Sequence, residues 1–305
     1  MKNWFFLFFF LIAYAAQAQT ITGNVLDSAT NKPLAYAIVI YNFQKSITYT
    51  DANGIFYIQK DSLTQNDSVS IQFVGYKKIL IAASSIKNGS TFMLAPEVNV
   101  LNPVIVYACR KTRDYEINRR IGRIKHYIGP GPETKFIVLA KYNNTSGRNG
   151  YVSAVQIFLD QPSPDFKVPI RFRWYQWDAT NKKPGRELTD TNIIVYPTQD
   201  GWNNFALPAY VVTAPKDYIV FGLEFIYPTE YKQEYTMLKS AADKIKWLTN
   251  MQHRWSLGMQ YSNNESDAGF YSINNGPFSS YNQRDDRYYM RPALILTITA
   301  CAEKQ

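Results

Sequence analysis

The stretch Thr50-Asp51-Ala52-Asn53-Gly54-Ile55-Phe56-Tyr57-Ile58 decides the fold of the N-terminal part of the chain. Asp51 and Asn53 belong to the residue types that favour tight turns, and Gly54 can adopt the positive φ that other residues resist. The four residues that follow are β-branched or aromatic, which is typical of strands. We therefore predict a hairpin turn at this point, with a strand on each side of it.

Similar short strand patterns continue outward from this turn in both directions. They are separated by turn residues and cover 20–27, 37–41, 55–58, 69–74 and 78–81. Several short strands at close spacing indicate a small antiparallel β-sandwich.

Four blocks of this region also resemble, in the same order, the carboxypeptidase-like regulatory domain. The blocks are Gly23-x-Val25-x-Asp27, Pro33-Leu34-x-x-Ala37-x-Val39, Thr50-Asp51-x-x-Gly54-x-Phe56-x-Ile58 and Phe73-x-Gly75-Tyr76. The segment Asn102–Val106 resembles the one that often follows this domain in TonB-dependent outer-membrane transporters. The resemblance implies a prealbumin-like sandwich of seven strands, without catalysis of its own, over residues 19–96. It implies no particular ligand.

The N-terminus has the three parts of a secretory signal peptide. Lys2 precedes an apolar run from Trp4 to Tyr14 that is too short to anchor the chain in a bilayer. Ala16 and Ala18 then stand where a signal peptidase reads small residues. We expect residues 1–18 to be removed, leaving an exported protein of the periplasm, outer membrane or cell surface with no transmembrane segment. The formal charge of +9 therefore does not indicate a nucleic-acid partner.

Residues 97–133 are predicted to be a linker that contains a basic amphipathic helix. Ile117, Ile121, Ile124 and Ile128 recur at helical spacing, and Gly129-Pro130-Gly131-Pro132 would end the helix. The seven basic residues of this region are Arg110, Lys111, Arg113, Arg119, Arg120, Arg123 and Lys125. A solvated face of a connector explains them most simply, with attraction to acidic lipid or polysaccharide as the alternative.

Residues 134–305 are rich in longer strand patterns and suggest a jelly-roll-like sandwich. The candidates are 135–142, 151–159, 169–178, 192–196, 202–207, 218–226, 255–261 and 292–300. A helix or lid is expected over Met237–Leu248, and long loops around one short strand over Ser262–Arg287. The expected fold class is therefore all-β, with two sandwiches joined by the amphipathic helix.

The two cysteines, Cys109 and Cys301, lie far apart in strand-like surroundings. An oxidising compartment would permit a disulfide between them. Two separate buried thiols fit the sequence equally well.

The sequence contains none of the motifs that commonly mark catalytic, metal or cofactor sites. His126 and His253 have no metal-binding neighbour at i+2 or i+4, and H-E-x-x-H, paired-cysteine, G-x-S-x-G, P-loop and dinucleotide motifs are absent. We expect no metal or cofactor. The loop that carries Asp178, Asn181, Glu187 and Asp190 could suit calcium, but its interleaved cations favour a plain solvated loop.

Glu224 is the carboxylate with the greatest potential for chemistry, because it stands in the middle of a strand. A glycosidase would need it to face a second carboxylate across a cleft. Pairing with an arginine on an adjacent strand is the preferred interpretation.

The strand Pro169–Asp178 supplies the candidate ligand-binding residues. Period two places Ile170, Phe172 and Trp174 on one face; the other face carries Arg171, Arg173, Tyr175 and Trp177. Exposed aromatic rings and guanidinium groups together suit an acidic polysaccharide. Packing of these side chains on an ordinary sheet face is the simpler alternative.

Together these features predict an exported, non-catalytic accessory or adhesion-type protein. Its second sandwich would bind a glycan or another envelope protein. The alternative is a carbohydrate-active hydrolase whose carboxylates meet only in the folded chain.

We predict that the mature protein begins at Gln19, because Ala16 and Ala18 fit the peptidase and the apolar run ends just before them. The intact mass of protein isolated from the cell envelope measures this directly. A mass that includes Met1, or one increased by a lipid, would contradict the prediction.

Overall fold

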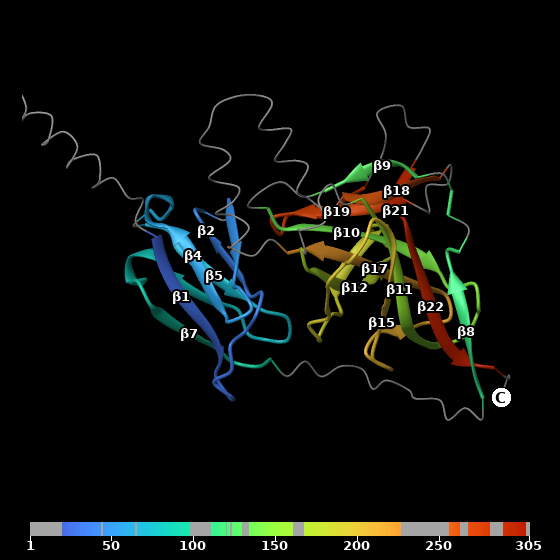
Figure 1. Cartoon of the computed structure of the whole chain (residues 1–305), viewed down its shortest axis with the longest axis horizontal. Coiled ribbons are helices and arrows are strands. Elements are labelled where there is room, and N and C mark those ends of the chain that lie inside the picture. The colour runs from blue at the N-terminus through green and yellow to red at the C-terminus, as the bar shows by residue number, and fades with distance from the viewer. Residues whose placement is uncertain are drawn as a thin grey trace, which may run out of the picture. The chain divides into compact units, whose positions relative to one another are not determined.

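The computed structural model describes residues 20–43, 45–64, 66–97, 111–119, 121–122, 124–129, 134–160, 168–226, 256–262, 268–280 and 289–302. Strands dominate this part of the chain (Figure 1), and its helical elements are two 3-10 turns, η1 (Lys60–Ser62) and η2 (Ala83–Ser85). The chain divides into two compact units: residues 1–73 with 77–96, and residues 74–76 with 97–305. The predicted all-β class with two β-sandwiches is confirmed.

The first unit contains seven strands in two sheets. Its three-stranded sheet has the order β4 (Ile55–Gln59), β1 (Thr20–Asp27), β7 (Ser90–Leu94). Its four-stranded sheet has the order β3 (Ser46–Tyr49), β2 (Ile38–Tyr41), β5 (Ser68–Gln72), β6 (Ile79–Ala82). The β1–β7 pair is parallel, so the sandwich is not wholly antiparallel as predicted.

The turn at Asp51–Gly54 is present, but the hairpin predicted there is wrong. The strand before the turn, β3, pairs with β2, whereas β4 after it pairs with β1 in the other sheet. The turn therefore carries the chain from one sheet to the other. Asp51 holds it by accepting hydrogen bonds from the backbone N–H groups of Asn53 and Ile55 at 2.8 and 2.9 Å. Gly54 has the positive φ that the sequence indicated, +75°.

The second unit consists of a seven-stranded and an eight-stranded sheet. The first has the order β13 (Lys183–Glu187), β12 (Ile170–Asp178), β17 (Tyr218–Phe225), β10 (Phe136–Asn143), β19 (Gly269–Ile273), β20 (Ser279–Ser280), with β14 (Ile194–Val195) on β12. The second has the order β21 (Tyr289–Pro292), β18 (Ser256–Ser262), β11 (Gly150–Asp160), β22 (Leu294–Cys301), β8 (Thr112–Ile117). Two short strands, β15 (Gly201–Ala206) and β16 (Thr213–Ala214), pair with β11, and β9 (Ile124–Ile128) pairs with β18.

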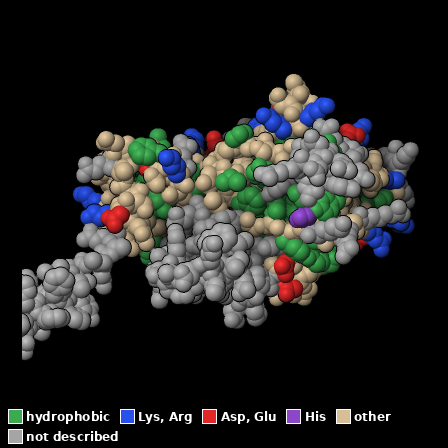
Figure 2. Space-filling view, turned by 90° about the horizontal axis from the view of Figure 1, so that it is seen from above, with side chains coloured by type: hydrophobic (Ala, Val, Ile, Leu, Met, Phe, Trp, Pro, Cys, Tyr) green, Lys and Arg blue, Asp and Glu red, His purple; other side chains and the backbone are tan. Residues whose placement is uncertain are grey.

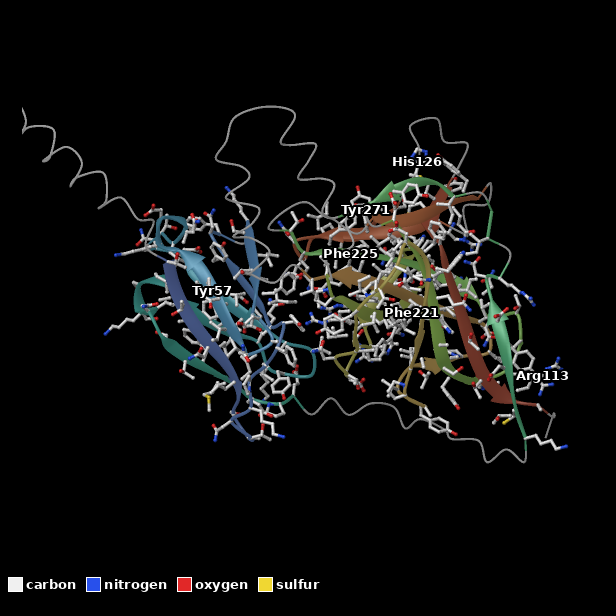
Figure 3. The ribbon with its side chains drawn as sticks, viewed as in Figure 1. Tyr57, Arg113, His126, Phe221, Phe225 and Tyr271 are labelled. Carbon is white, nitrogen blue, oxygen red and sulfur yellow. The ribbon has the colours of Figure 1, made fainter. Side chains whose placement is uncertain are left out.

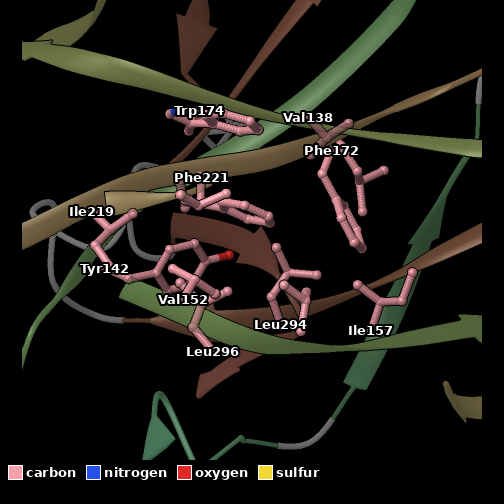
Figure 4. Close-up of a cluster of buried hydrophobic side chains, with 14 of the residues drawn as sticks. Val138, Tyr142, Val152, Ile157, Phe172, Trp174, Ile219, Phe221, Leu294 and Leu296 are labelled. Carbon is pink, nitrogen blue, oxygen red and sulfur yellow. The ribbon is translucent and has the colours of Figure 1, made fainter. Parts of the chain in front are cut away.

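One continuous apolar core lies between these two sheets, because alternate residues of each strand point inward. Val138, Phe172 and Phe221 come from the seven-stranded sheet, and Ile157 and Leu294 from the eight-stranded one (Figure 4). Figure 3 shows Phe221 and Phe225 of β17 among these inner side chains, while the exposed His126 lies at the margin of the unit.

The amphipathic helix predicted between the sandwiches is wrong. Residues 112–117 form β8, which pairs with β22, and residues 124–128 form β9, which pairs with β18. The isoleucines at helical spacing are β-branched, so they also fit strands. The strands β22 and β18 supply hydrogen bonds to these two segments over a long distance in sequence, which helical spacing cannot reveal. The described part of the predicted linker from residue 111 to 129 thus belongs to the second unit.

Several other predictions fall outside the described residues. These are the signal peptide, the helix at Met237–Leu248, His253 and Cys109. None of the described helices is both long and apolar enough to cross a membrane.

Cys301 is disulfide-bonded, and Cys109 is the one other cysteine of the chain. We predict that denatured, unreduced protein has no thiol that can be alkylated, and that reduction exposes two thiols per chain. Mass spectrometry after alkylation, before and after reduction, counts them. Alkylation before reduction would contradict the bond.

We predict that Gly54→Val destabilises the first unit by about 3 kcal/mol or more, because the side chain adds a clash to the strain of a positive φ. A Cβ at Gly54 would lie 2.8 Å from the carbonyl oxygen of Val25 and 3.0 Å from Pro33 Cβ. Gly89→Val is the matched control, since Gly89 has a φ of +78° but no atom within 4 Å of such a Cβ.

Chemical denaturation measures the difference between these two variants, and limited proteolysis reports whether the second unit stays intact. Equal destabilisation by both variants would show that the clash is unimportant. Simultaneous loss of both units would contradict a boundary between them.

Candidate functional site

The two faces of β12 differ as the alternation of its sequence predicted. Phe172 and Trp174 enter the core between the sheets, and Arg171, Arg173, Tyr175 and Trp177 point to the opposite side, here called the outer face. The prediction that this second set is exposed is wrong for three residues. Arg171, Arg173 and Tyr175 are only 0%, 3% and 7% exposed, whereas Trp177 is partly exposed. The outer face of β12 is covered as well. The two-residue alternation of the sequence therefore separated the two faces of the strand but did not show that both are buried.

The two arginines converge on Glu224 of the neighbouring strand β17. Arg171 lies directly opposite Glu224 in the β12–β17 pair, and its Nη1 is 3.4 Å from Glu224 Oε2. Arg173 Nε donates to the same oxygen at 2.6 Å, and Arg173 Nη1 pairs with Glu187 on β13. These four residues are here called the ion cluster. The preferred interpretation of Glu224, pairing with an arginine on an adjacent strand, is confirmed.

Gly222 makes room for this convergence. Arg173 stands opposite Gly222, two positions along β17 from Glu224, so its guanidinium can pass over a residue without a side chain. The neighbouring strand β10 also requires glycine at this position. A Cβ there would lie 2.1 Å from the carbonyl oxygen of Val138.

Lys135 adds a third buried cation beside the ion cluster. It is 6% exposed, and its amine donates to Asn275 Oδ1 at 2.6 Å. Burial, and next the positive charge of Arg173, lower the pKa of Lys135 from 10.5 to about 8, against the opposing effect of Glu224. Buried charges of this kind require their partners: removal of one member typically destabilises by about 3–5 kcal/mol.

The ion cluster brings two carboxylates together, but in an arrangement unsuited to glycoside hydrolysis. Glu187 and Glu224 are both paired with Arg173, and the side chain of Glu224 is completely buried. A glycosidase needs both carboxyl groups in contact with the substrate. Only Glu187 is partly exposed, so this pair does not offer the two accessible carboxyl groups that the hydrolase interpretation needs.

The outer face changes character toward the other end of β12, where aromatic rings surround one lysine. The Lys141 amine on β10 lies 4.9 Å from the ring centroid of Trp177 and 4.3 Å from that of Tyr218. Trp177 meets Phe270 edge-on at 5.7 Å, and Tyr175 meets Phe278 edge-on at 5.1 Å. Lys141, Trp177 and Tyr218 are each partly exposed. These three residues are here called the aromatic–lysine patch.

The calcium alternative does not gain support from the loop after β12. Asp178 Oδ1 accepts the backbone N–H groups of Thr180 and Asn181, both at 3.0 Å, and its Oδ2 accepts the Asn181 side-chain amide at 2.7 Å. The hydrogen bonds from Asn181 lower the pKa of Asp178. Glu187 belongs to the ion cluster instead. Among the described residues, no three His, Cys, Asp or Glu side chains gather as metal ligands would.

Sequence reasoning missed Lys141 and Tyr218, although it had placed both in strands. Alternation assigns Lys141 to the same face as Ile137 and Leu139. What the sequence lacks is the strand order. Because β17 lies between β12 and β10, Trp177, Tyr218 and Lys141 meet across three strands that are far apart in the chain.

A second aromatic group lies on the eight-stranded sheet and was also not predicted. Trp202 meets Phe158 edge-on at 5.4 Å, and Tyr127 is 6.5 Å from Phe158. On the face seen in Figure 2, hydrophobic side chains gather beside the histidine, with lysine and arginine side chains around them. No buried charge cluster was found behind this group among the described residues.

Comparison with solved structures gives a distant likeness over most of the chain. It is to the cysteine protease and lectin-like domains of Cwp84, a surface layer associated protein of Clostridium difficile, at 10% identity and a TM-score of 0.34. The likeness covers 88% of this chain and 59% of that one. It is too weak to carry an argument about function. No curated protein matches the chain.

Comparison with protein families gives a match over the first unit. Residues 21–106 match the model of the CarboxypepD_reg-like domain. The matched region contains all seven strands of the first sandwich except the first residue of β1. The N-terminal part of the chain is therefore a CarboxypepD_reg-like domain, as the four sequence blocks indicated.

Proposed function

We propose that the chain is an exported, non-catalytic accessory protein of the periplasm or cell surface, and that its second sandwich binds an acidic glycan. The observation that carries the proposal is the aromatic–lysine patch, in which the Lys141 amine lies between two partly exposed rings. Trp177 is the member of the patch that the sequence had already selected.

The chemistry of the patch fits a sugar that bears a carboxylate or sulfate. An ammonium group between aromatic rings is held by the negative faces of the rings, and its remaining N–H bonds can donate to an anion. Aromatic rings also give flat apolar surface for the C–H face of a sugar, while Tyr218 has a hydroxyl for hydrogen bonding. A neutral glycan would use only the aromatic surface and the Tyr218 hydroxyl, and not the charge of the ammonium group.

The ion cluster supports the same proposal by fixing the strand that carries Trp177. Binding residues are most precise when rigid elements and paired neighbours hold them in place. Arg171 and Arg173 thus act behind the binding surface and not on it. This assigns the four residues predicted as one strip to three tasks: the arginines position β12, Tyr175 packs on Phe278, and Trp177 faces the ligand.

We predict that Trp177→Ala and Lys141→Met each weaken binding of an acidic polysaccharide about tenfold, which corresponds to about 1.4 kcal/mol. The Lys141 contribution should fall with rising salt, because it is a charge interaction at a partly exposed site, and the Trp177 contribution should persist. A glycan array containing carboxylated, sulfated and neutral polysaccharides, followed by titration of the best ligand, measures both effects.

Two further variants separate binding from folding. Tyr127→Ala removes an exposed aromatic ring from the eight-stranded sheet and should leave binding unchanged. Glu224→Gln removes the carboxylate that the two buried arginines share, leaves Glu187 as the one acid of the ion cluster, and should destabilise the second unit by about 3–5 kcal/mol. If no glycan on the array binds, and an envelope protein binds in a way that depends on Trp177, then the partner is a protein and the glycan proposal is wrong.

A further inference from the structure

The last strand of the four-stranded sheet, β6, has an apolar edge beside which the described residues place no further strand. β6 pairs with β5 on one side and ends the sheet order β3-β2-β5-β6. Its sequence is Ile79-Leu80-Ile81-Ala82, and Leu80 is 66% exposed. An apolar edge strand of this kind is a template for pairing with another chain.

The backbone of β6 shows which groups point outward. The N–H of Ala83 donates to the carbonyl oxygen of Asp67 at 2.9 Å, in register with the β5–β6 pair. Since hydrogen-bonding direction alternates along a strand, the N–H and C=O groups of Ile79 and Ile81 also point toward β5. Those of Lys78, Leu80 and Ala82 therefore point away from the sheet.

We propose that β6 pairs with β6 of a second copy of this chain, antiparallel and centred on Leu80. In this register Leu80 faces Leu80 of the other copy, and Lys78 faces Ala82 in both halves. Leu80 then exchanges two hydrogen bonds with its copy, and the Ala82 N–H donates to the Lys78 carbonyl oxygen of the other copy; the Ala82 carbonyl oxygen already accepts the Ser85 hydroxyl at 2.7 Å. A continuous eight-stranded sheet would result from the two four-stranded sheets.

Side-chain chemistry favours this two-fold register over its neighbours. The two exposed Leu80 side chains cover each other, which removes apolar surface from water. Lys77 and Lys78, both exposed, lie at opposite ends of the paired strands and do not repel each other. If the pairing were centred on Lys78, the lysines of the two copies would face each other. If it were centred on Ala82, the two Leu80 side chains would no longer face each other.

The paired segment is short, so we expect a weak dimer whose population rises with protein concentration. A dimer would place two second units, and thus two aromatic–lysine patches, in one assembly. Two linked binding sites can raise the apparent affinity for a repeating polymer well above that of one site. The dimer itself does not depend on the proposed glycan.

Cysteine cross-linking of the mature chain tests the register. In an antiparallel hydrogen-bonded pair the Cα atoms are about 5.5 Å apart, within the range of about 4.4–6.8 Å that a disulfide requires. Leu80→Cys should therefore form a covalent dimer under mild oxidation. Ala82→Cys is the matched control, because its two copies would be about 13 Å apart. The double variant Lys78→Cys with Ala82→Cys should cross-link again.

Sedimentation of the uncross-linked protein gives an independent measurement. Leu80→Pro removes an outward N–H and the exposed side chain without removing a bond to β5, so it should fold and lose self-association at least tenfold. Met93→Lys, a change at an exposed residue of the other sheet, should leave self-association unchanged. Absence of a Leu80→Cys dimer, equal cross-linking of Ala82→Cys, or unchanged association of Leu80→Pro would each overturn the proposal.

Discussion

The contact between Glu224 and two arginines is the constraint on which the rest of the second unit depends. Taking three charges out of water is unfavourable, and the attraction among them offsets this only when their geometry is good. The contact therefore requires that β12 and β17 keep one register, with Arg171 opposite Glu224 and Arg173 opposite Gly222. A slip by one residue would turn the arginines into the apolar core and move Phe172 and Trp174 to the outer face, beside Glu224. The cluster thus fixes which residues of β12 can reach the surface.

This constraint explains why the sequence predicted the strands well and the site poorly. Alternating apolar residues located β10, β11, β12 and β17 to within about two residues, and the resemblance of four short blocks to a known family identified the first domain. The arginines of β12 looked like surface residues because charged side chains are rarely buried. Their burial is tolerable because Glu224, 53 positions from Arg171, pairs with both, and because Glu187 and Asn192 bind one arginine each. Spacing in sequence does not contain that pairing.

The failed helix has a related cause. Residues 112–128 satisfy helical spacing and strand composition at the same time, so local pattern alone cannot choose between them. The choice is made by β22 and β18, which offer six and four paired positions to β8 and β9. Hydrogen bonds to distant strands and burial of Ile117 outweigh the local preference. The same error occurred at Asp51–Gly54, where the turn was local and predictable but its two strands belong to different sheets.

The exposed apolar side chains of the two units lie in different surroundings, and this difference bears on the two proposals. In the second unit, paired charges hold β12 while aromatic rings around Lys141 stay partly open to water, which is the arrangement of a ligand site with a rigid support. In the first unit, Leu80 lies on a strand edge whose outward N–H and C=O groups can pair with the backbone of another strand. A sugar has no such backbone. The two proposed partners therefore differ in class: a glycan for the rings and the ammonium group of the second unit, and another polypeptide backbone for β6.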